Sequence, residues 1–435
     1  MTQYLPPPGF APVPSALSGI ELYAPAPEPT TREPDVIDFK CPQCRATTAY
    51  CVTDGGLRCV HCGYYEPPTQ PVVGKGAEAF EFTVETMTAA AEAARLQAHG
   101  WGAARKELQC QNCRARTSLA EGGLTHTCPF CGSNKVLQHD APQDELRPRF
   151  LIPFKIEARA CQTVVRDWLG SSWMTPKALQ EIARVARFNP IYLPYWTFDA
   201  NTAADWEAEV GHEETERYYD SSAKEWRTRT VTVWRWESGH ARQHFDDLLV
   251  PGTSRLSQVL LDRLRSFDTR ALVAYEPQFL AGMMAQAYDV PLERAWEIGR
   301  ERMREQTREA CRGQASTSKI RNFSMQLDFS DESWRYVLLP VYVSVYTYED
   351  ETYQVMVNGQ TGEVSGQRPV DWTKVWLAIA AMVTPGVLLG LVSLPFLLLF
   401  LPLGLILIGV AFIALVAGGM FAFSTFQKAR EMGHV

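Results

Sequence analysis

The residues best suited to chemistry in this 435-residue chain are eight cysteines arranged as four Cys-x-x-Cys pairs. The first two pairs lie in CPQCRATTAYCVTDGGLRCVHC, residues 41–62, and the second two lie in CQNCRARTSLAEGGLTHTCPFC, residues 110–131. Two such pairs bring four thiolates to one tetrahedral ion, and a closed shell of four thiolates leaves no position for an activated water. The spacing therefore predicts two structural zinc ions. The expected ligands are Cys41, Cys44, Cys59, Cys62, Cys110, Cys113, Cys128 and Cys131.

Each set of four cysteines needs a small element to hold it, which predicts one zinc ribbon over 38–66 and a second over 106–137. A unit of about thirty residues is too small to bury a sufficient core. Binding of a structural zinc ion, about 10 to 16 kcal/mol, would supply the folding free energy instead. Glycine follows the second cysteine in two of the four turns, but Arg45 and Arg114 occupy that position in the other two. Loss of one ligand is expected to unfold its ribbon.

The other cysteines, Cys51, Cys161 and Cys311, do not form a disulfide pattern, and this usage favours a reducing compartment. The first residues, MTQYLPPPGF, lack a basic patch followed by an apolar stretch, so no cleavable secretory signal is expected. The part of the chain that carries the ribbons is therefore predicted to lie in the cytoplasm.

Two segments outside the ribbons have simple compositions. Residues 1–37 contain nine prolines and little hydrophobic periodicity, which predicts a disordered tail. Residues 67–105 form a linker between the ribbons, and the alanine-rich FTVETMTAAAEAARLQAHG within it predicts a short spacer helix.

Residues 147–371 have the pattern of a mixed α+β domain with an antiparallel sheet. Three apolar strands are expected, in FLIPFKIEA, IYLPYWTFDA and VLLPVYVSVYTY. Proline lacks the N–H that a ladder needs, so Pro153, Pro194 and Pro340 are expected at strand entrances or edges. Asn358-Gly359 predicts a hairpin turn. Helical periodicity appears in EARACQTVVRDWL and again over 291–311, and it places Cys161 and Cys311 on core-facing stripes.

The end of the chain predicts a membrane anchor. Residues 375–427, 53 in all, contain no charged side chain. Because one crossing takes about 20 residues, this run is long enough for two helices, expected near 373–393 and 402–425 within a segment 372–427. Residues 428–435 would form a short cytoplasmic tail. An even number of crossings predicts a multi-pass protein of the inner, or plasma, membrane with both termini in the cytoplasm.

The distribution of charge bears on whether the protein binds nucleic acid. The net charge is −7, and residues 374–435 carry three basic side chains and one acidic, so residues 1–373 carry −9. A soluble part of that sign repels nucleic acid at long range. The second ribbon is nevertheless locally basic, and a nucleic-acid-binding alternative would use Arg114, Arg116 and Lys135 on phosphates.

No nucleotide-binding loop, metalloprotease motif or nucleophile elbow occurs in the sequence, which predicts a protein that is not an enzyme. The ribbons, together with IYLPYWTFDA, FLAGMMAQAYDVPLERAW and YQVMVNGQTGEVSGQRP, resemble a family of bacterial membrane-anchored double-zinc-ribbon proteins. Members of that family often carry zinc-ribbon or primosomal-helicase-like names, although no helicase motif is present here. The resemblance implies partners such as phage-shock and flotillin-like (SPFH) proteins at the membrane.

These observations together predict a membrane-anchored scaffold or adaptor that presents cytoplasmic domains to protein partners, in envelope stress or membrane organisation. The lipid bilayer is its second expected partner. A membrane-tethered nucleic-acid-binding protein remains the alternative, and an enzyme whose site assembles only in three dimensions is a third reading.

Overall fold

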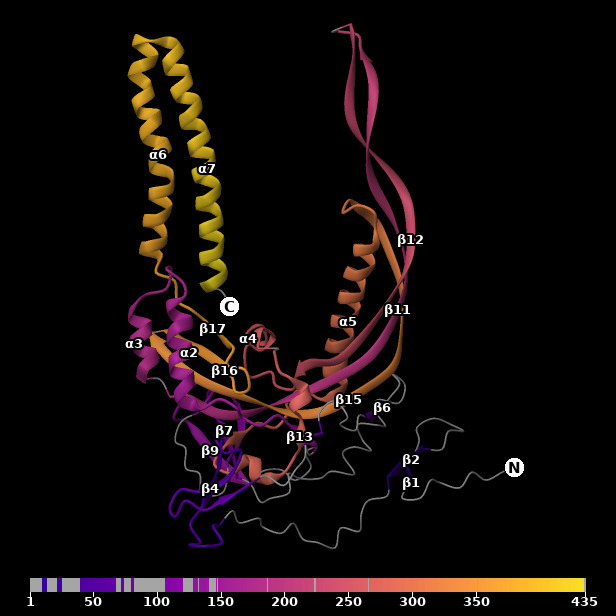
Figure 1. The fold of residues 1–435 in the computed structure, drawn as a ribbon, viewed down its shortest axis with the longest axis vertical. Helices are drawn as coiled ribbons and strands as arrows, with labels where there is room; N and C mark the ends of the chain where they lie inside the picture. The colour runs from indigo at the N-terminus through magenta and orange to yellow at the C-terminus, as the bar shows by residue number, and fades with distance from the viewer. Residues whose placement is uncertain are drawn as a thin grey trace, which may run out of the picture.

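The chain folds as a mixed α+β protein with largely antiparallel sheets, as expected, and it ends in two long apolar helices (Figure 1). The structure is a computed structural model. It describes residues 10–13, 22–25, 40–67, 72–73, 80–81, 106–119, 128–131, 133–140, 146, 148–185, 187–222, 224–264, 266–349 and 351–433.

Three very long strands organise the main sheet. The strand β11 (Asn189–Asp220) pairs antiparallel with β15 (Ile320–Tyr348) and with β12 (Glu225–Pro251). Shorter strands complete the twelve-stranded sheet around them: β6 (Phe80–Glu81), β7 (Lys106–Cys110), β8 (Arg116–Leu119), β9 (Val136–Asp140), β10 (Phe150–Leu151), β13 (Val273–Ala274), β14 (Met284–Ala285), β16 (Glu351–Asn358) and β17 (Val364–Gly366). Only the β10–β15 and β11–β14 pairs are parallel within this described sheet.

Pro194 and Pro340 lie inside these long strands, which corrects the first part of the expectation that they lie at strand entrances or edges. Each proline sits where one edge of its strand changes neighbours. The neighbour of β11 changes from β14 to β12 around Pro194, and that of β15 changes from β10 to β16 around Pro340. Because no ladder partner needs an N–H at such a changeover, a proline is tolerated there. Pro153 lies just beyond β10.

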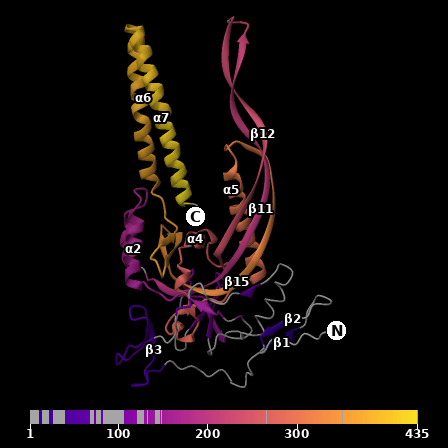
Figure 2. The ribbon, with the colours of Figure 1, turned by 45° about the vertical axis from the view of Figure 1, so that its right-hand side comes forward.

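Beyond the body, β11 and β12 continue as a twisted β-ribbon, with β15 alongside for part of its length (Figures 1 and 2). The ribbon carries charged side chains. The cross-strand ion pair of Arg229 with Glu216, 2.9 Å, helps to hold β11 and β12 in register, and Lys319, just before β15, pairs with Glu213 at 2.6 Å. The sequence reasoning did not foresee strands of this length.

In the described part of the chain, four helices pack on the body: α2 (Ala158–Gly170), α3 (Ala178–Val185), α4 (Gln258–Arg263) and α5 (Leu292–Gln314). The 3-10 turns η2 (Thr269–Ala271) and η3 (Pro277–Leu280) lie between them in the chain. The helix α5 lies along the base of the ribbon, where small side chains let it approach the strands, namely Ala204, Ala208 and Ala241. Cys161 on α2 and Cys311 on α5 are buried, which confirms their predicted core positions.

The two C-terminal helices, α6 (Trp372–Leu399) and α7 (Leu401–Gly433), pack side by side as a hairpin that leaves the body on the same side as the ribbon (Figure 2). Both are long and apolar enough to cross a membrane. The base of the hairpin is attached to the loop after α2: the backbone N–H of Asp371 donates to the carbonyl of Met174, and Lys374 Nζ donates to that of Thr175. Val375 is buried against Met174 and Ala429.

Two further predictions have different outcomes. The Asn358-Gly359 hairpin is confirmed, since β16 and β17 pair across a turn in which Asn358 Oδ1 accepts from the N–H groups of Gln360 and Thr361. In the proline-rich tail, the described residues form an antiparallel pair, β1 (Phe10–Val13) with β2 (Leu22–Pro25). The rest of the predicted disordered tail, residues 1–37, lies outside the described residues. The predicted spacer helix falls outside the described residues.

Candidate metal centres

The first four cysteines converge at the end of a small separate sheet, β3 (Thr48–Cys51), β4 (Gly56–Cys59) and β5 (Tyr65–Glu66). The four sulfur atoms, of Cys41, Cys44, Cys59 and Cys62, lie within 4.8 Å of one another. The closest pairs are Cys41 to Cys62, 3.4 Å, and Cys44 to Cys59, 3.5 Å. A tetrahedral ion with metal–sulfur bonds of about 2.3 Å places its sulfurs about 3.8 Å apart. The arrangement could therefore hold one metal ion.

The turns of this first tetrad have matching backbone geometry. The N–H of Arg45 donates to the carbonyl of Cys41, and the N–H of Gly63 donates to that of Cys59. Both of these following residues are left-handed, with φ of 60° at Arg45 and 77° at Gly63. Glycine adopts this conformation at little cost, whereas arginine is strained in it. Both turns without glycine therefore carry this backbone strain, since Arg114 also has φ of 60°.

The second tetrad has the same internal geometry but a different setting. The sulfur atoms of Cys110, Cys113, Cys128 and Cys131 also lie within 4.8 Å of one another. Its strands β7, β8 and β9 belong to the main sheet, where β8 pairs with β14. In addition, Gln354 on β16 donates its Nε2 to the carbonyl of Phe130, 2.6 Å away. The second tetrad is thus built into the body of the protein.

In each tetrad, backbone N–H groups stabilise the deprotonated, thiolate form of one cysteine. The N–H of Cys62, with that of His61, lowers the pKa of the Cys59 thiol to about 6 despite its burial. Burial acts to raise the pKa of Cys110, but the N–H groups of Cys113 and Asn112 bring it down to about 7. A thiolate is the form that binds metal, so these N–H groups prepare each site for a cation.

The two tetrads differ in what their second turns present to solvent. In the second tetrad the turn is CPFC, and the ring of Phe130 is fully buried in the body. In the first tetrad the turn is CVHC; Val60 is 83% exposed and His61 is exposed beside it. The same cysteine spacing thus serves one inward-facing and one outward-facing turn.

The basic residues proposed for nucleic-acid contact are not equally accessible. Arg114 and Lys135 are exposed. Arg116, however, donates to the buried carboxylate of Glu107 at 2.7 Å. A guanidinium held by a buried acid is committed to the structure, so the three side chains do not form one free cationic patch.

A third group of ligand-type side chains lies in the sheet, where Asp199, Asp246 and Asp247 come together. The guanidinium of Arg335 supplies positive charge to this cluster through Asp199 and Asp247. The sequence reasoning missed this cluster, because Asp199 on β11 and the two aspartates on β12 are distant in the sequence and meet only in the fold. A buried arginine paired with two carboxylates is a structural ion-pair network.

Comparison with known proteins gives one informative similarity. No family model matches the chain, and no solved structure matches it. The Bacillus subtilis (strain 168) protein named Uncharacterized protein YdjG is 25% identical over 355 residues, which cover 78% of this chain and 92% of YdjG. The similarity extends over most of both chains, and the name assigns no activity.

Proposed function

We propose that this protein is a membrane-anchored scaffold or adaptor whose two tetrads bind structural zinc and whose cytoplasmic body is presented to protein partners. Zinc is the metal that four thiolates at tetrahedral spacing suit best, and a closed thiolate shell suits a structural role. The spacing of the sulfurs supports this assignment in both tetrads.

The anchor in this proposal is the α6–α7 hairpin, which crosses the inner membrane twice. Its long uncharged run is exposed along most of both helices, a pattern unfavourable in water and favourable in lipid. Trp372 and Trp376 at its base suit the interface, and Lys374 and Arg430 lie outside the apolar run. Both ends of the hairpin meet the body, which supports placing both termini on the cytoplasmic side.

One observation favours protein partners most: the exposed turn of the first tetrad lies at the end of the body opposite the hairpin (Figure 1). A zinc-stabilised turn with an exposed valine and histidine offers a rigid, partly apolar contact, which suits a protein partner. The family resemblance suggests phage-shock or flotillin-like (SPFH) proteins as partners.

The test is to purify the full chain from its host in mild detergent, without nuclease and at low salt, and to identify what accompanies it. A Val60→Ser, His61→Ala double variant should retain metal at both tetrads but lose stoichiometric protein partners. Leu137→Ser, which changes an exposed apolar residue of the second ribbon, is the matched control and should retain them. Recovery of nuclease-sensitive nucleic acid released by moderate salt, with no protein partner, would contradict the scaffold.

A further inference from the structure

A row of arginines on α5 lies opposite a row of apolar side chains on β15. The arginines recur every four residues, at Arg300, Arg304, Arg308 and Arg312, and the apolar residues recur every two, at Phe323, Met325, Leu327 and Phe329. Four residues of helix rise about 6.0 Å and two residues of strand about 6.8 Å, so the rows stay in register. The guanidinium of Arg312 lies 5.3 Å from the ring centroid of Phe323, and that of Arg300 lies 4.8 Å from that of Phe329.

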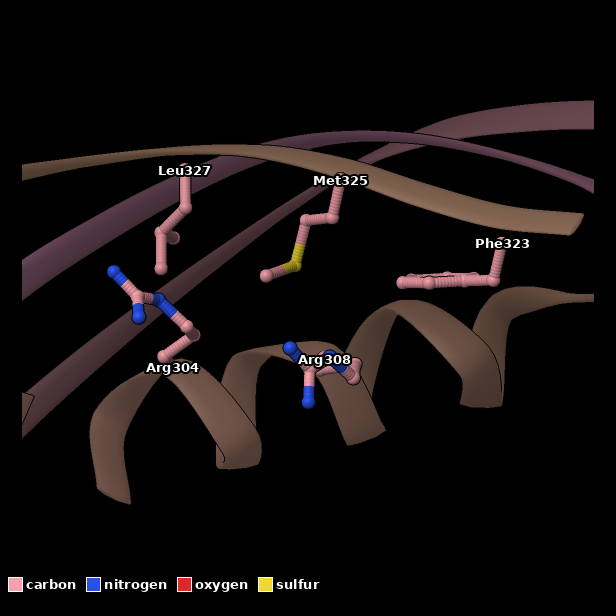
Figure 3. Close-up of a pocket in the computed structure, with 5 residues that line it drawn as sticks. All are labelled: Arg304, Arg308, Phe323, Met325 and Leu327. Atoms are coloured by element: carbon pink, nitrogen blue, oxygen red, sulfur yellow. The ribbon is translucent and has the colours of Figure 1, made fainter. Parts of the chain in front are cut away.

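Between these end contacts lies a hollow of about 380 Å³ (Figure 3). Its floor consists of Phe323, Met325 and Leu327, which point from β15 toward α5, and its helix side consists of Arg304 and Arg308. We call these five residues, together with the adjoining edge of β15, the α5–β15 groove. A volume of this size is at the lower end of the range for specific binding sites.

The two central arginines keep capacity for an anionic ligand. Arg304 Nη1 donates to Glu301 at 2.8 Å, and Arg308 Nη1 donates to Glu305. Each contact uses one nitrogen of a guanidinium that carries five N–H donors. The side chains are 42% and 34% exposed, so a carboxylate can reach them from solvent without entering the core.

The edge of β15 beside the groove presents backbone groups as well. Two irregularities in the β11–β15 register, opposite Glu207/Glu209 and Asp199/Asn201, bound the regular stretch Ser324–Ser330. One edge of this stretch pairs with β11, and its outer edge pairs with no other strand in the described part of the chain. Slightly further along the chain, β6 pairs with that outer edge at Ser333 and Trp334. The edge of β15 therefore accepts an added strand.

We infer that the α5–β15 groove binds an extended segment of a partner protein that carries acidic side chains at alternate positions and adds to β15 as a strand. Alternate side chains of such a strand face α5 about 6.8 Å apart, close to the spacing of Arg304 and Arg308. Two successive carboxylates would each meet one guanidinium in a charge-assisted hydrogen bond. This inference rests on the proposed scaffold function and names the chemistry of one partner.

A lipid fits this groove less well. An acyl chain cannot use the backbone N–H and C=O groups of the β15 edge. The groove also continues into a ribbon that carries exposed charged residues, including Asp328 on β15 and Glu214 on β11, which lipid tails disfavour.

The test uses two labelled probe peptides and the purified full chain in detergent. One peptide alternates glutamate with threonine, and the other has the same composition with its glutamates in one block. Fluorescence anisotropy should show tighter binding of the alternating peptide. Arg304→Gln or Arg308→Gln should weaken it about tenfold, the loss expected for one charge-assisted hydrogen bond. Arg294→Gln is the matched control, an exposed α5 arginine paired with Glu297, and should bind as the unchanged protein does.

Hydrogen exchange distinguishes strand addition from simple charge attraction. The alternating peptide should slow amide exchange within Ser324–Ser330. Unchanged exchange there, equal binding of the two peptides, or equal binding by the Arg304→Gln and Arg294→Gln variants would overturn the inference. Arginine-dependent binding to phosphatidylglycerol vesicles without peptide binding would overturn it in favour of a lipid site. Equal metal content and melting temperature in the variants exclude misfolding as the cause.

The result of the peptide-binding test can be distinguished from the result of the partner purification that tests the scaffold function. If protein partners are lost from the Val60→Ser, His61→Ala variant while the peptide fails to bind, the groove inference alone is wrong. If the peptide binds in an arginine-dependent manner but no partner accompanies the chain from its host, the scaffold proposal is wrong and the groove remains a peptide-binding site.

Discussion

Arg335 Nη2 lies 3.1 Å from Asp199 Oδ2 at the place where the long strands leave the body and become the ribbon. Arg335 is only 7% exposed, and its Nη1 also donates to Asp247. The register of β11 shifts beside Asp199 on both of its edges, and Asp247 adopts a left-handed conformation with φ of 56°. The buried ion pair thus lies at the irregularity that directs the ribbon away from the sheet.

Replacing Arg335 by methionine should destabilise the folded body by about 3 to 5 kcal/mol, because two acidic groups would then be left without their buried counter-ion. Thermal unfolding of the full chain in detergent measures this. Arg229→Met removes an exposed strand arginine paired with Glu216 and should cost at most about 1 kcal/mol. Equal losses of unfolding free energy in the two variants would show that the Arg335 network does not stabilise the folded body.

The stability should also depend on pH through Asp247. Burial raises the pKa of this carboxyl, and the negative charges of Asp199 and Asp246 raise it further. The positive charge of Arg335 acts in the opposite direction but does not cancel the increase. Because the folded pKa lies above the unfolded one, protonation favours the folded state. The contribution is fully present below the unfolded pKa and is lost as pH rises through the folded pKa. Asp247→Asn should therefore lose less stability than the unchanged protein as pH rises across the acidic range. Melting temperatures of both proteins, measured over that range, test this. An unaltered pH profile would contradict this.

The two tetrads should respond differently to loss of a ligand. Cys59→Ser should remove one metal ion and unfold the small β3–β5 sheet, and it should lower the melting temperature of the body only slightly, through the loss of the contacts that Tyr50 and Leu57 make with the main core. Cys128→Ser should also remove one ion, but it should lower the melting temperature of the body by more than about 5 °C, because β7, β8 and β9 belong to the main sheet. Metal content and calorimetry measure both effects. Identical melting of the two variants would contradict the integration of the second tetrad.

Local chemistry accounts for what the sequence could predict. The cysteine spacing predicted both tetrads, the uncharged run predicted α6 and α7, and period-3.6 patterns predicted the buried faces of α2 and α5. In each case the signal lies within one contiguous segment. The Asn358-Gly359 turn belongs to the same class.

Other features depend on contacts between distant segments, which periodicity does not record. The Arg335 network joins β11, β12 and β15, and the α5–β15 groove needs the registry of a helix with a strand. The sequence pattern did not predict the length of β11, because the charged second half of this strand resembles a solvated loop. Cross-strand pairs such as Arg229 with Glu216 make it a strand, and no local pattern specifies them.

The packing of the helical hairpin depends on specific glycines. A Cβ on Gly418 would overlap the carbonyl oxygen of Met382 on α6, whereas a Cβ on the adjacent Gly419 meets no atom within 4 Å. Gly418→Ile should therefore force the helices apart and cost about 2 kcal/mol, while Gly419→Ile should be tolerated. Disulfide cross-linking between introduced cysteines on α6 and α7 reports their separation. Equal cross-linking in both variants would show that close helix contact is not required.

The last prediction concerns the position of the ribbon in a membrane. The ribbon and the α6–α7 hairpin extend from the body on the same side and to a similar height (Figures 1 and 2). The ribbon carries charges such as Glu214 and Arg229, and each charged side chain at a bilayer centre costs about 2.5 to 3.5 kcal/mol. If the hairpin crosses a bilayer, the ribbon and the hairpin must separate.

Spin labels introduced at Lys224 and Phe400 should lie further apart in nanodiscs than in detergent. A second pair, at Lys224 and Glu297, should keep its distance if the hairpin swings and change it if the ribbon bends at Asp199. Identical Lys224–Phe400 distances in both media would contradict either membrane crossing by the hairpin or exclusion of the ribbon from the bilayer.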